Sequence, residues 1–216
     1  MSRRQSSIPA RYFDDLYAGE RDPWEFETSA YEQAKYDATL AALPRPRYRR
    51  GLEIGCSIGV LTARLAGRCA SLLAIDVSKK ALDAARMRCR TLPNVALENI
   101  SVPAEWPAGS FDLIMLSEVV YYLDAGDVSR LADRVSASVE PGGNVCTAGQ
   151  LMVEKHAQGG HDFLCTKPLQ ELSLFSVADT DDTKPGCMPR GHTGSAVREG
   201  DCLLWLDAKA AARNHQ

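Results

Sequence analysis

The sequence predicts an α/β fold in which a doubly wound parallel sheet carries helices on both faces. Two observations lead to this prediction. From residue 51 to residue 148, short apolar runs typical of buried strands alternate with amphipathic helical patterns. The chain has 216 residues, of which 45% are hydrophobic, and this is enough for one domain with its own core.

Residues 8–43 are expected to form two helices around a turn. In "IPARYFDDLYAG" the apolar residues recur at helical spacing. Pro23 cannot continue a helix, so the second helix begins later, with Thr28 or Ser29 as its N-cap and Glu32 near the capping-box position. Two prolines then end it.

The alternating region is expected to build the sheet. Its strands are short runs of Ile, Leu and Val, and its helices have polar faces and start signals such as Ser78 as an N-cap. Sheets of this type bind ligands beyond the carboxyl ends of their strands. The expected strands are 51–55, 70–76, 95–100, 111–117 and 144–148, and the expected helices are 58–67, 78–90 and 126–139.

Beyond residue 150 the pattern is weaker. The turn formers in "DTDDTKPGCMPRGHTG" indicate an exposed loop, and the polar end of the chain is expected to fray. The remaining expected elements are a helix over 160–172 and strands over 172–178 and 201–207.

Composition limits the classes of partner. A net charge of −3 disfavours nucleic acid, and Arg45, Arg47, Arg49 and Arg50 are interpreted as a solvated approach to the first strand. The seven scattered cysteines show no C-x-x-C pair and no zinc spacing, which indicates reduced thiols and no metal site. Without a signal peptide or a long apolar stretch, we expect a cytoplasmic protein with no membrane span.

The turn "EIGCSIGV", residues 53–60, decides between cofactors. A dinucleotide turn needs G-x-G-x-x-G, but counting from Gly55 places Ser57 and Val60 where the second and third glycines belong. Side chains there obstruct the close approach of a pyrophosphate. A phosphate-binding P-loop is excluded because no G-K-[ST] follows. A nicotinamide oxidoreductase is therefore disfavoured.

The remaining pattern is E-x-G-x-x-x-G, formed by Glu53, Gly55 and Gly59. An acid two residues before the first glycine is poorly placed for phosphate and well placed for a positively charged ligand. S-adenosylmethionine carries a sulfonium and an ammonium group and no phosphate, so it fits this turn. Asp76 ends the second expected strand, where a carboxylate can accept hydrogen bonds from both ribose hydroxyls.

The ends of the third and fourth expected strands complete the predicted cofactor site. Asn99, Ile100 and Ser101 are placed to contact adenine, although a plain loop is the alternative. The fourth strand ends at Ser117 and Glu118, which could hold the methionine ammonium, although Glu118 could equally be an ordinary helix-capping acid.

These motifs resemble a known family. The segment 52–59, Asp76, "FDLIMLSEVVYYL" and "EPGG" resemble class I S-adenosylmethionine-dependent methyltransferases, many of which have a glycine where Ser57 stands. "DPWEFETSAYEQAKY", residues 22–36, looks like the nodulation protein S-type family. Its best-known members N-methylate the deacetylated glucosamine end of a chito-oligosaccharide. The likeness covers roughly residues 12–145.

The resemblance implies a Rossmann-like methyltransferase sheet, S-adenosylmethionine as methyl donor and S-adenosylhomocysteine as product. It also implies an N-terminal helical lid in which Trp24 and Phe26 cover the cofactor, with Tyr31 and Lys35 at the mouth; Cys56 and Val77 are placed in the cofactor site. The implied divisions of this single domain are a lid over 1–47, a cofactor-binding core over 48–150, an acceptor-shaping part over 151–207 and a tail over 208–216.

For the reaction itself, we expect transfer to a small-molecule acceptor, with an amine or amino sugar favoured. Glu118 and Tyr122 are the candidate catalytic residues at the acceptor side. An O- or carboxyl methyltransferase, with His156 or His161 as base, is the first alternative. A non-catalytic regulatory protein that binds S-adenosylmethionine is the second. The protein is expected to be a monomer or a homodimer.

Overall fold

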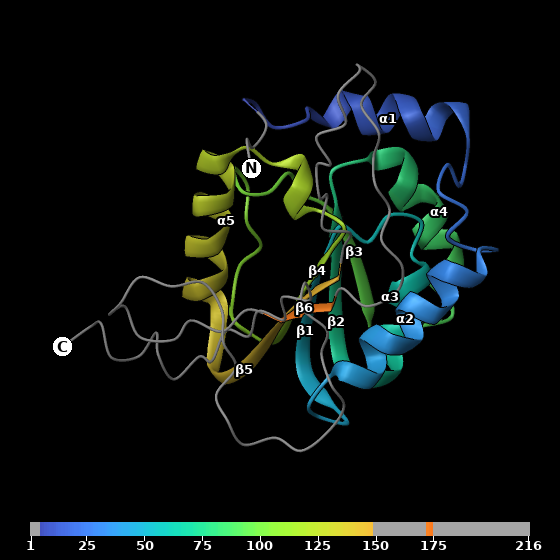
Figure 1. Ribbon diagram of the computed structural model, residues 1–216. Coiled ribbons are helices and arrows are strands. Elements are labelled where there is room, and N and C mark those ends of the chain that lie inside the picture. Colours follow the sequence, from blue (N-terminus) through green and yellow to red (C-terminus); the bar gives the residue numbers. More distant parts are fainter. Residues whose placement is uncertain (1–4, 149–171, 175–216) are drawn as a thin grey trace, which may run out of the picture.

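The computed structural model describes residues 5–148 and 172–174. These residues form one six-stranded sheet with the order β3-β2-β1-β4-β5-β6 (Figure 1). The first five strands are parallel, and β6 pairs antiparallel to β5. The strands are β1 Tyr48–Ile54, β2 Cys69–Asp76, β3 Val95–Asn99, β4 Phe111–Ser117, β5 Val139–Ala148 and β6 Leu172–Leu174.

The described helices form the outer layers of the domain. Two short 3₁₀ turns, η1 Ala66–Arg68 and η2 Val120–Tyr122, extend the loops before β2 and α5. The α-helices are α1 Ala10–Gly19, α2 Ala30–Ala42, α3 Val60–Leu65, α4 Lys79–Cys89 and α5 Ala125–Ser138.

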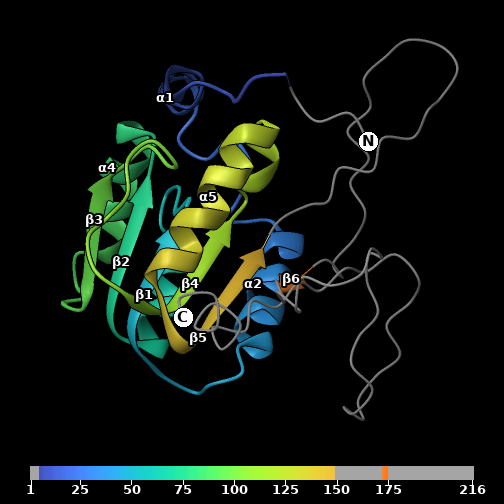
Figure 2. The same cartoon turned by 90° about the vertical axis from the view of Figure 1, so that its left-hand side faces the viewer.

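Two hydrophobic cores lie on opposite faces of the sheet. Leu113 and Met115 of β4 pack with α2 and α3 on one face, whereas Ile114 and Leu116 pack with α5 on the other. This division follows from the alternation of side chains along a strand. Figure 2 shows α5 in front of the sheet and α2 and α4 behind it. All seven residues of β4 are buried, as expected for a central parallel strand.

The fold confirms the predicted doubly wound sheet, with differences at element boundaries. β5 begins at Val139 instead of at residue 144, because a register shift between Phe111 and Leu113 lets the Pro-Gly-Gly segment bulge within the strand. The first core helix, α3, ends at Leu65 and continues as a 3₁₀ turn. The helix over 160–172 and the strand over 201–207 lie outside the described residues. Of the predicted strand 172–178, residues 172–174 are described and form β6.

Helix starts follow the predicted signals. Ser78 is the N-cap of α4 and accepts a hydrogen bond from the Ala81 N–H. Ser29 is the N-cap of α2, and its hydroxyl accepts from the Glu32 N–H. The Glu32 side chain pairs with Lys35, one turn along the same helix, at 2.6 Å.

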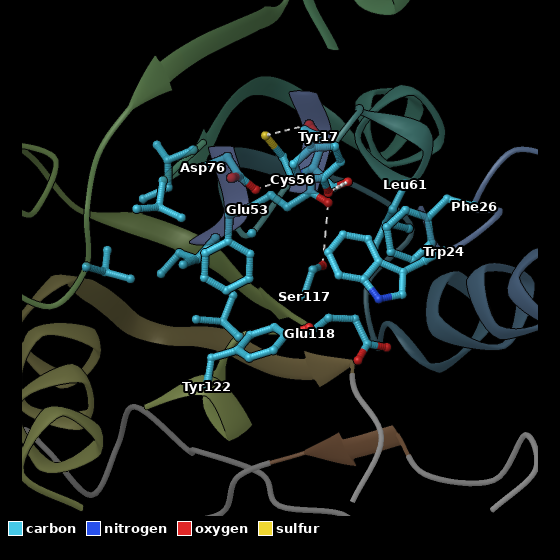
Figure 3. A pocket seen from close by; sticks show the side chains of 18 of the residues that line it. Tyr17, Trp24, Phe26, Glu53, Cys56, Leu61, Asp76, Ser117, Glu118 and Tyr122 are labelled. Atoms are coloured by element: carbon cyan, nitrogen blue, oxygen red, sulfur yellow. Dashed lines mark hydrogen bonds between the residues drawn. The ribbon is translucent and has the colours of Figure 1, made fainter. Parts of the chain in front are cut away.

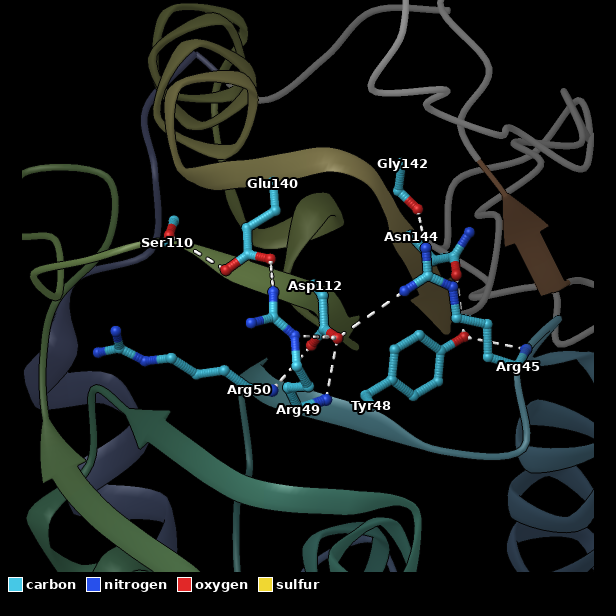
Figure 4. A network of polar contacts seen from close by, with 9 residues as sticks. All are labelled: Arg45, Tyr48, Arg49, Arg50, Ser110, Asp112, Glu140, Gly142 and Asn144. Atoms are coloured by element: carbon cyan, nitrogen blue, oxygen red, sulfur yellow. Dashed lines mark hydrogen bonds and ion pairs between the residues drawn. The ribbon is translucent and has the colours of Figure 1, made fainter.

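The arginine-rich approach to β1 forms a polar network at the amino ends of the strands (Figure 4). Buried Asp112 of β4 accepts the backbone N–H groups of Arg49 and Arg50 at 2.9 and 2.8 Å. The Arg45 side chain lies 3.8 Å from the same carboxylate, and the exposed Arg49 side chain pairs with Glu140. This cluster therefore links β1 to β4 and β5. The arginine-rich segment has this structural role in addition to being solvated, as the sequence predicts.

The cysteines that the structure describes are Cys56, Cys69, Cys89 and Cys146, and all four are buried free thiols. None of the helices in the described ranges is long and apolar enough to cross a membrane.

Candidate functional site

A cavity of about 570 Å³ lies at the carboxyl ends of β1, β2 and β4. Strand order reverses between β1 and β4, so the cavity occupies the topological switch point of the sheet. Helix α1, the loop after it and α2 form the outer wall. Figure 3 shows side chains from the strand ends and from this N-terminal segment, residues 5–47, directed into the same space.

The turn after β1 requires glycine at Gly55. Its φ of 83° is left-handed, and an added Cβ would lie well inside van der Waals contact with the Ser117 carbonyl oxygen and Val119 Cγ2. Gly59 also has a positive φ of 79° and serves as the N-cap of α3. It does not line the cavity; a Cβ there would meet Ala85 of α4 at 3.1 Å. Gly59 thus positions α3 against α4.

Glu53 is the most unusual group in the site. It lies on β1, has no solvent exposure and lines the cavity. The Ser117 hydroxyl donates to Oε1 at 3.5 Å, and Oε2 has no hydrogen-bond partner among the described residues. Burial raises the pKa of Glu53 to about 7, opposed in part by the Ser117 hydroxyl. A buried carboxyl with spare acceptor capacity suits a cationic ligand.

Asp76 holds the turn from the neighbouring strand. Its Oδ2 accepts the Ser57 N–H and its Oδ1 accepts the Ser78 N–H, both at 2.8 Å. Burial raises the pKa of Asp76 to about 6, although these backbone hydrogen bonds lower it. Each carboxylate oxygen can accept a further bond, because it has more than one lone pair. Val77, the next residue, also lines the cavity.

The end of β3 contributes less than predicted. The Asn99 side chain donates to the carbonyl oxygens of Asp76 and Val77 at 2.9 and 2.8 Å, and Asn99 does not line the cavity. The amide therefore braces the end of β2. Ile100 and Ser101 do line the cavity.

The N-terminal segment covers the turn with aromatic side chains. The Tyr17 hydroxyl of α1 contacts the Ser57 hydroxyl directly. The Trp24 ring packs edge-on against Tyr17 and is stacked on Phe26, with ring centroids 5.5 Å apart in both pairs. Cys56 lies in the wall beneath. Of the predicted mouth residues, Lys35 lines the cavity and Tyr31 does not.

Tyr17 is a site residue that the sequence pattern does not identify, and Ser57 enters the prediction only as the place where a glycine is missing. The available signal was the row of apolar and aromatic residues at helical spacing in α1, which indicates a buried face. The spacing predicts that this face is buried, but it does not predict which element the face packs against.

Glu118 and Tyr122 lie at the other side of the cavity. Glu118 has a left-handed φ of 54°; its Oε1 lies 2.6 Å from Lys35 Nζ, and its Oε2 accepts from the Tyr121 hydroxyl at 2.7 Å. The Tyr122 ring packs on Phe13 of α1 at 4.9 Å between centroids. Glu118 is therefore held from both sides. His156 and His161 lie outside the described residues.

The donor set fits S-adenosylmethionine. Glu53 offers a buried, incompletely bonded carboxyl, and Asp76 offers spare acceptor positions one strand away. Among the described residues that line the cavity, Lys35 is the basic one, and it already pairs with two carboxylates. Such a site suits a cationic nucleoside better than a diphosphate.

Solved structures share this architecture. The N-methyltransferase NodS from Bradyrhizobium japonicum WM9, in complex with S-adenosyl-L-homocysteine, matches with a TM-score of 0.58 and 26% identity over 65% of this chain and 72% of that one. A putative methyltransferase from Pseudomonas syringae is 45% identical over 55% of this chain and 75% of its own, with a TM-score of 0.50. The fold is that of the S-adenosylmethionine-dependent methyltransferase class.

The sequence comparison narrows the class to a family. The model for nodulation protein S (NodS) matches residues 14–140, and the chain belongs to this family. Nodulation protein S of Bradyrhizobium diazoefficiens is 35% identical over 103 residues, which are 47% of this chain and 49% of that protein. The chain spans about half the length of the curated relatives it matches.

Proposed function

We propose that this protein transfers a methyl group from S-adenosylmethionine to the nitrogen of a small amine or amino-sugar acceptor. The observation that carries the proposal is the convergence of Glu53 and Asp76 on one cavity, with an acceptor oxygen of Glu53 left without a hydrogen-bond partner among the described residues. Family membership and the S-adenosyl-L-homocysteine complex of the related NodS structure support the same donor.

In this proposal, residues at the ends of different strands bind different parts of the cofactor. Asp76 accepts hydrogen bonds from the ribose hydroxyls, and Glu53 compensates positive charge near the turn at Gly55. Ile100 and Ser101 contact the adenine. Each group already lines the cavity, so binding requires no rearrangement of the sheet.

Bound S-adenosylmethionine supplies a methyl group on an activated sulfonium leaving group. The chain's own residues then contribute orientation and exclusion of water. Holding two reacting partners in line can lower the barrier by about 7–11 kcal/mol. Tyr17 and Trp24 cover the turn from the N-terminal segment, which serves as the lid in this proposal.

The acceptor side favours a cationic or amine-bearing molecule. Glu32, Lys35 and Glu118 together carry one excess negative formal charge at the cavity wall. The rings of Tyr122 and Phe13 line the same cavity and offer flat apolar surface to the face of a sugar ring. Glu118 is the carboxylate proposed to hold the acceptor nitrogen or receive its proton, and Tyr122 lines the same side.

A methyl-transfer screen tests the proposal. Purified protein is incubated with S-adenosylmethionine and with matched sets of amines, amino sugars, phenols and carboxylates, including partly deacetylated chito-oligosaccharides. We expect S-adenosylhomocysteine to form with amine-bearing acceptors, with the methyl group located on nitrogen by mass spectrometry. Methylation of hydroxyl or carboxyl groups alone would replace this proposal with the O-methyltransferase alternative. Tight cofactor binding without turnover of any acceptor would favour a regulatory protein.

A further inference from the structure

Lys35 occupies a position that the proposed chemistry does not by itself explain. Its Nζ lies 2.6 Å from Glu32 Oε2, on the same helix, and 2.6 Å from Glu118 Oε1, in the loop after β4. The side chains of Lys35, Glu32 and Glu118 are only 13%, 11% and 20% exposed. Helix α2 thus places a positively charged side chain against the Glu118 carboxylate, on the acceptor side of the cavity.

The ion pair is strong enough to hold Glu118 in place. Burial alone would lower the pKa of Lys35, but Glu118 and Glu32 outweigh it and raise that pKa, so the ammonium remains charged. A charge-assisted bond in a largely dry site is stronger than its equivalent at the surface. Tyr121 holds the second oxygen of Glu118 at 2.7 Å. The carboxylate is thereby fixed in orientation by Lys35 and Tyr121.

The same bond is not required to attach α2 to the domain. Tyr36 of α2 is buried in the core cluster that also contains Leu65 and Leu113. The Arg64 side chain pairs with Asp37 at 2.7 Å, at the middle of α2. Loss of the Lys35 ammonium would therefore leave α2 docked while removing the ion pairs to Glu118 and to Glu32.

We propose that Lys35 is a positioning residue, which orients Glu118 toward the acceptor from helix α2. The proposal rests on the methyltransferase function proposed above. It adds that α2 completes the acceptor side of the site in addition to covering the cofactor.

Steady-state kinetics test the proposal with Lys35→Met, Lys35→Arg, Glu118→Gln and the double variant Lys35→Met/Glu118→Gln. Lys80→Met, which removes an exposed lysine from α4, is the matched control. We expect Lys35→Met to lower kcat by about 10- to 100-fold, because misplacement of a reacting group by about 1 Å has effects of this order. Cofactor affinity should stay near wild type, and Lys35→Arg should recover part of the loss.

The double variant decides whether Lys35 acts through Glu118. If it does, the double variant loses no more kcat than Glu118→Gln alone. The proposal would be overturned if the kcat loss of the double variant equalled the product of the two single-variant losses. It would also be overturned if the kcat of Lys35→Met stayed within roughly twofold of wild type. If the wild-type protein methylates no amine, the proposed function itself is wrong.

Hydrogen–deuterium exchange supplies a measurement that needs no turnover. We expect Lys35→Met to raise amide exchange in residues 118–122 and to leave residues 36–42 at wild-type protection, because α2 keeps its other contacts. Increased exchange confined to residues 36–42 would mean that Lys35 merely holds the helix, which would overturn the proposal. This result is informative even if the acceptor differs from an amine.

Discussion

The backbone N–H of Ser57 donates to Oδ2 of Asp76 at 2.8 Å, and this bond joins the turn after β1 to the carboxyl end of β2. The ends of two neighbouring strands are thus linked by one carboxylate. Asp76 both shapes the glycine turn and, in the proposed function, faces the ribose.

Asp76→Asn should weaken cofactor binding while the fold is retained. The amide keeps one acceptor oxygen, but its NH2 group cannot accept the second of the backbone N–H bonds from Ser57 and Ser78. It also loses the charge that strengthens hydrogen bonds to the ribose, each worth about 1.5–3 kcal/mol. We expect a fall in affinity of about 10- to 150-fold by calorimetry. Asp83→Asn is the control, because that side chain is 70% exposed on α4. Equal affinity in wild type and Asp76→Asn would rule out the ribose role.

Gly55→Ala should abolish cofactor binding, because a methyl group at this left-handed position collides with the Ser117 carbonyl and Val119. The same collision should destabilise the protein by about 1–3 kcal/mol. Binding is therefore measured well below the unfolding temperature. Gly67→Ala is the matched control, since nothing lies within 4 Å of an added Cβ there. Retained binding in Gly55→Ala would show that the cofactor does not lie against this turn.

Cofactor-free stability should depend on pH through the two buried acids. The pKa values of Glu53 and Asp76 are raised from 4.5 and 3.8 to about 7 and about 6, so the folded state holds these protons more tightly than the unfolded state. The resulting stabilisation is complete below both unfolded values, declines as pH rises above about 4, and is lost once pH has passed the folded values of about 6 and about 7. Thermal unfolding across this range should show the decline, and Glu53→Gln should reduce it. An identical pH profile in Glu53→Gln would contradict the assignment.

Cofactor affinity should change with pH in the opposite direction. A cationic ligand interacts with the ionised carboxylates, so S-adenosylmethionine should bind more tightly as pH rises through about 6 to 7. Calorimetric titrations on either side of this window test the trend. Affinity that is highest in the acidic range would exclude Glu53 as the partner of the positive charge.

Asp112→Ala should show that this acid stabilises the fold and takes no part in cofactor binding. Asp112 accepts the Arg49 and Arg50 backbone N–H groups at the amino ends of the strands, away from the cavity. Its loss should lower the free energy of unfolding by about 1–3 kcal/mol, because these donors lose their partner. Chemical denaturation measures the change, and cofactor affinity at low temperature should match wild type. A clear loss of affinity would mean that the two ends of the sheet are coupled.

Local signals in the sequence were sufficient for the sheet and for the acidic motif. The Ser78 cap, the apolar β4 run and the glycine turn each depend on neighbours along the chain, and the structure has them as predicted. The bulge that starts β5 early could not be predicted, because it arises from register against β4.

The parts of the site that escaped prediction depend on contacts between distant segments. Tyr17 meets Ser57 across 40 positions, and Lys35 meets Glu118 across 83. Periodicity shows that α1 and α2 have buried faces and gives no indication of what lies opposite. Asn99 has a residue type that suits adenine, but its amide is used by the backbone of β2, which only coordinates reveal.

Glu53 also affects the thermal stability of the protein. A carboxyl with no solvent exposure, between the buried Leu52 and Ile54 of β1, opposes folding more than a methionine of similar length would. Exchange of Glu53 for Met should therefore raise the melting temperature and at the same time remove recognition of the methyl donor. Heat tolerance and ligand recognition make opposing demands at this one position, and variants selected for thermostability alone would be expected to lose the acid.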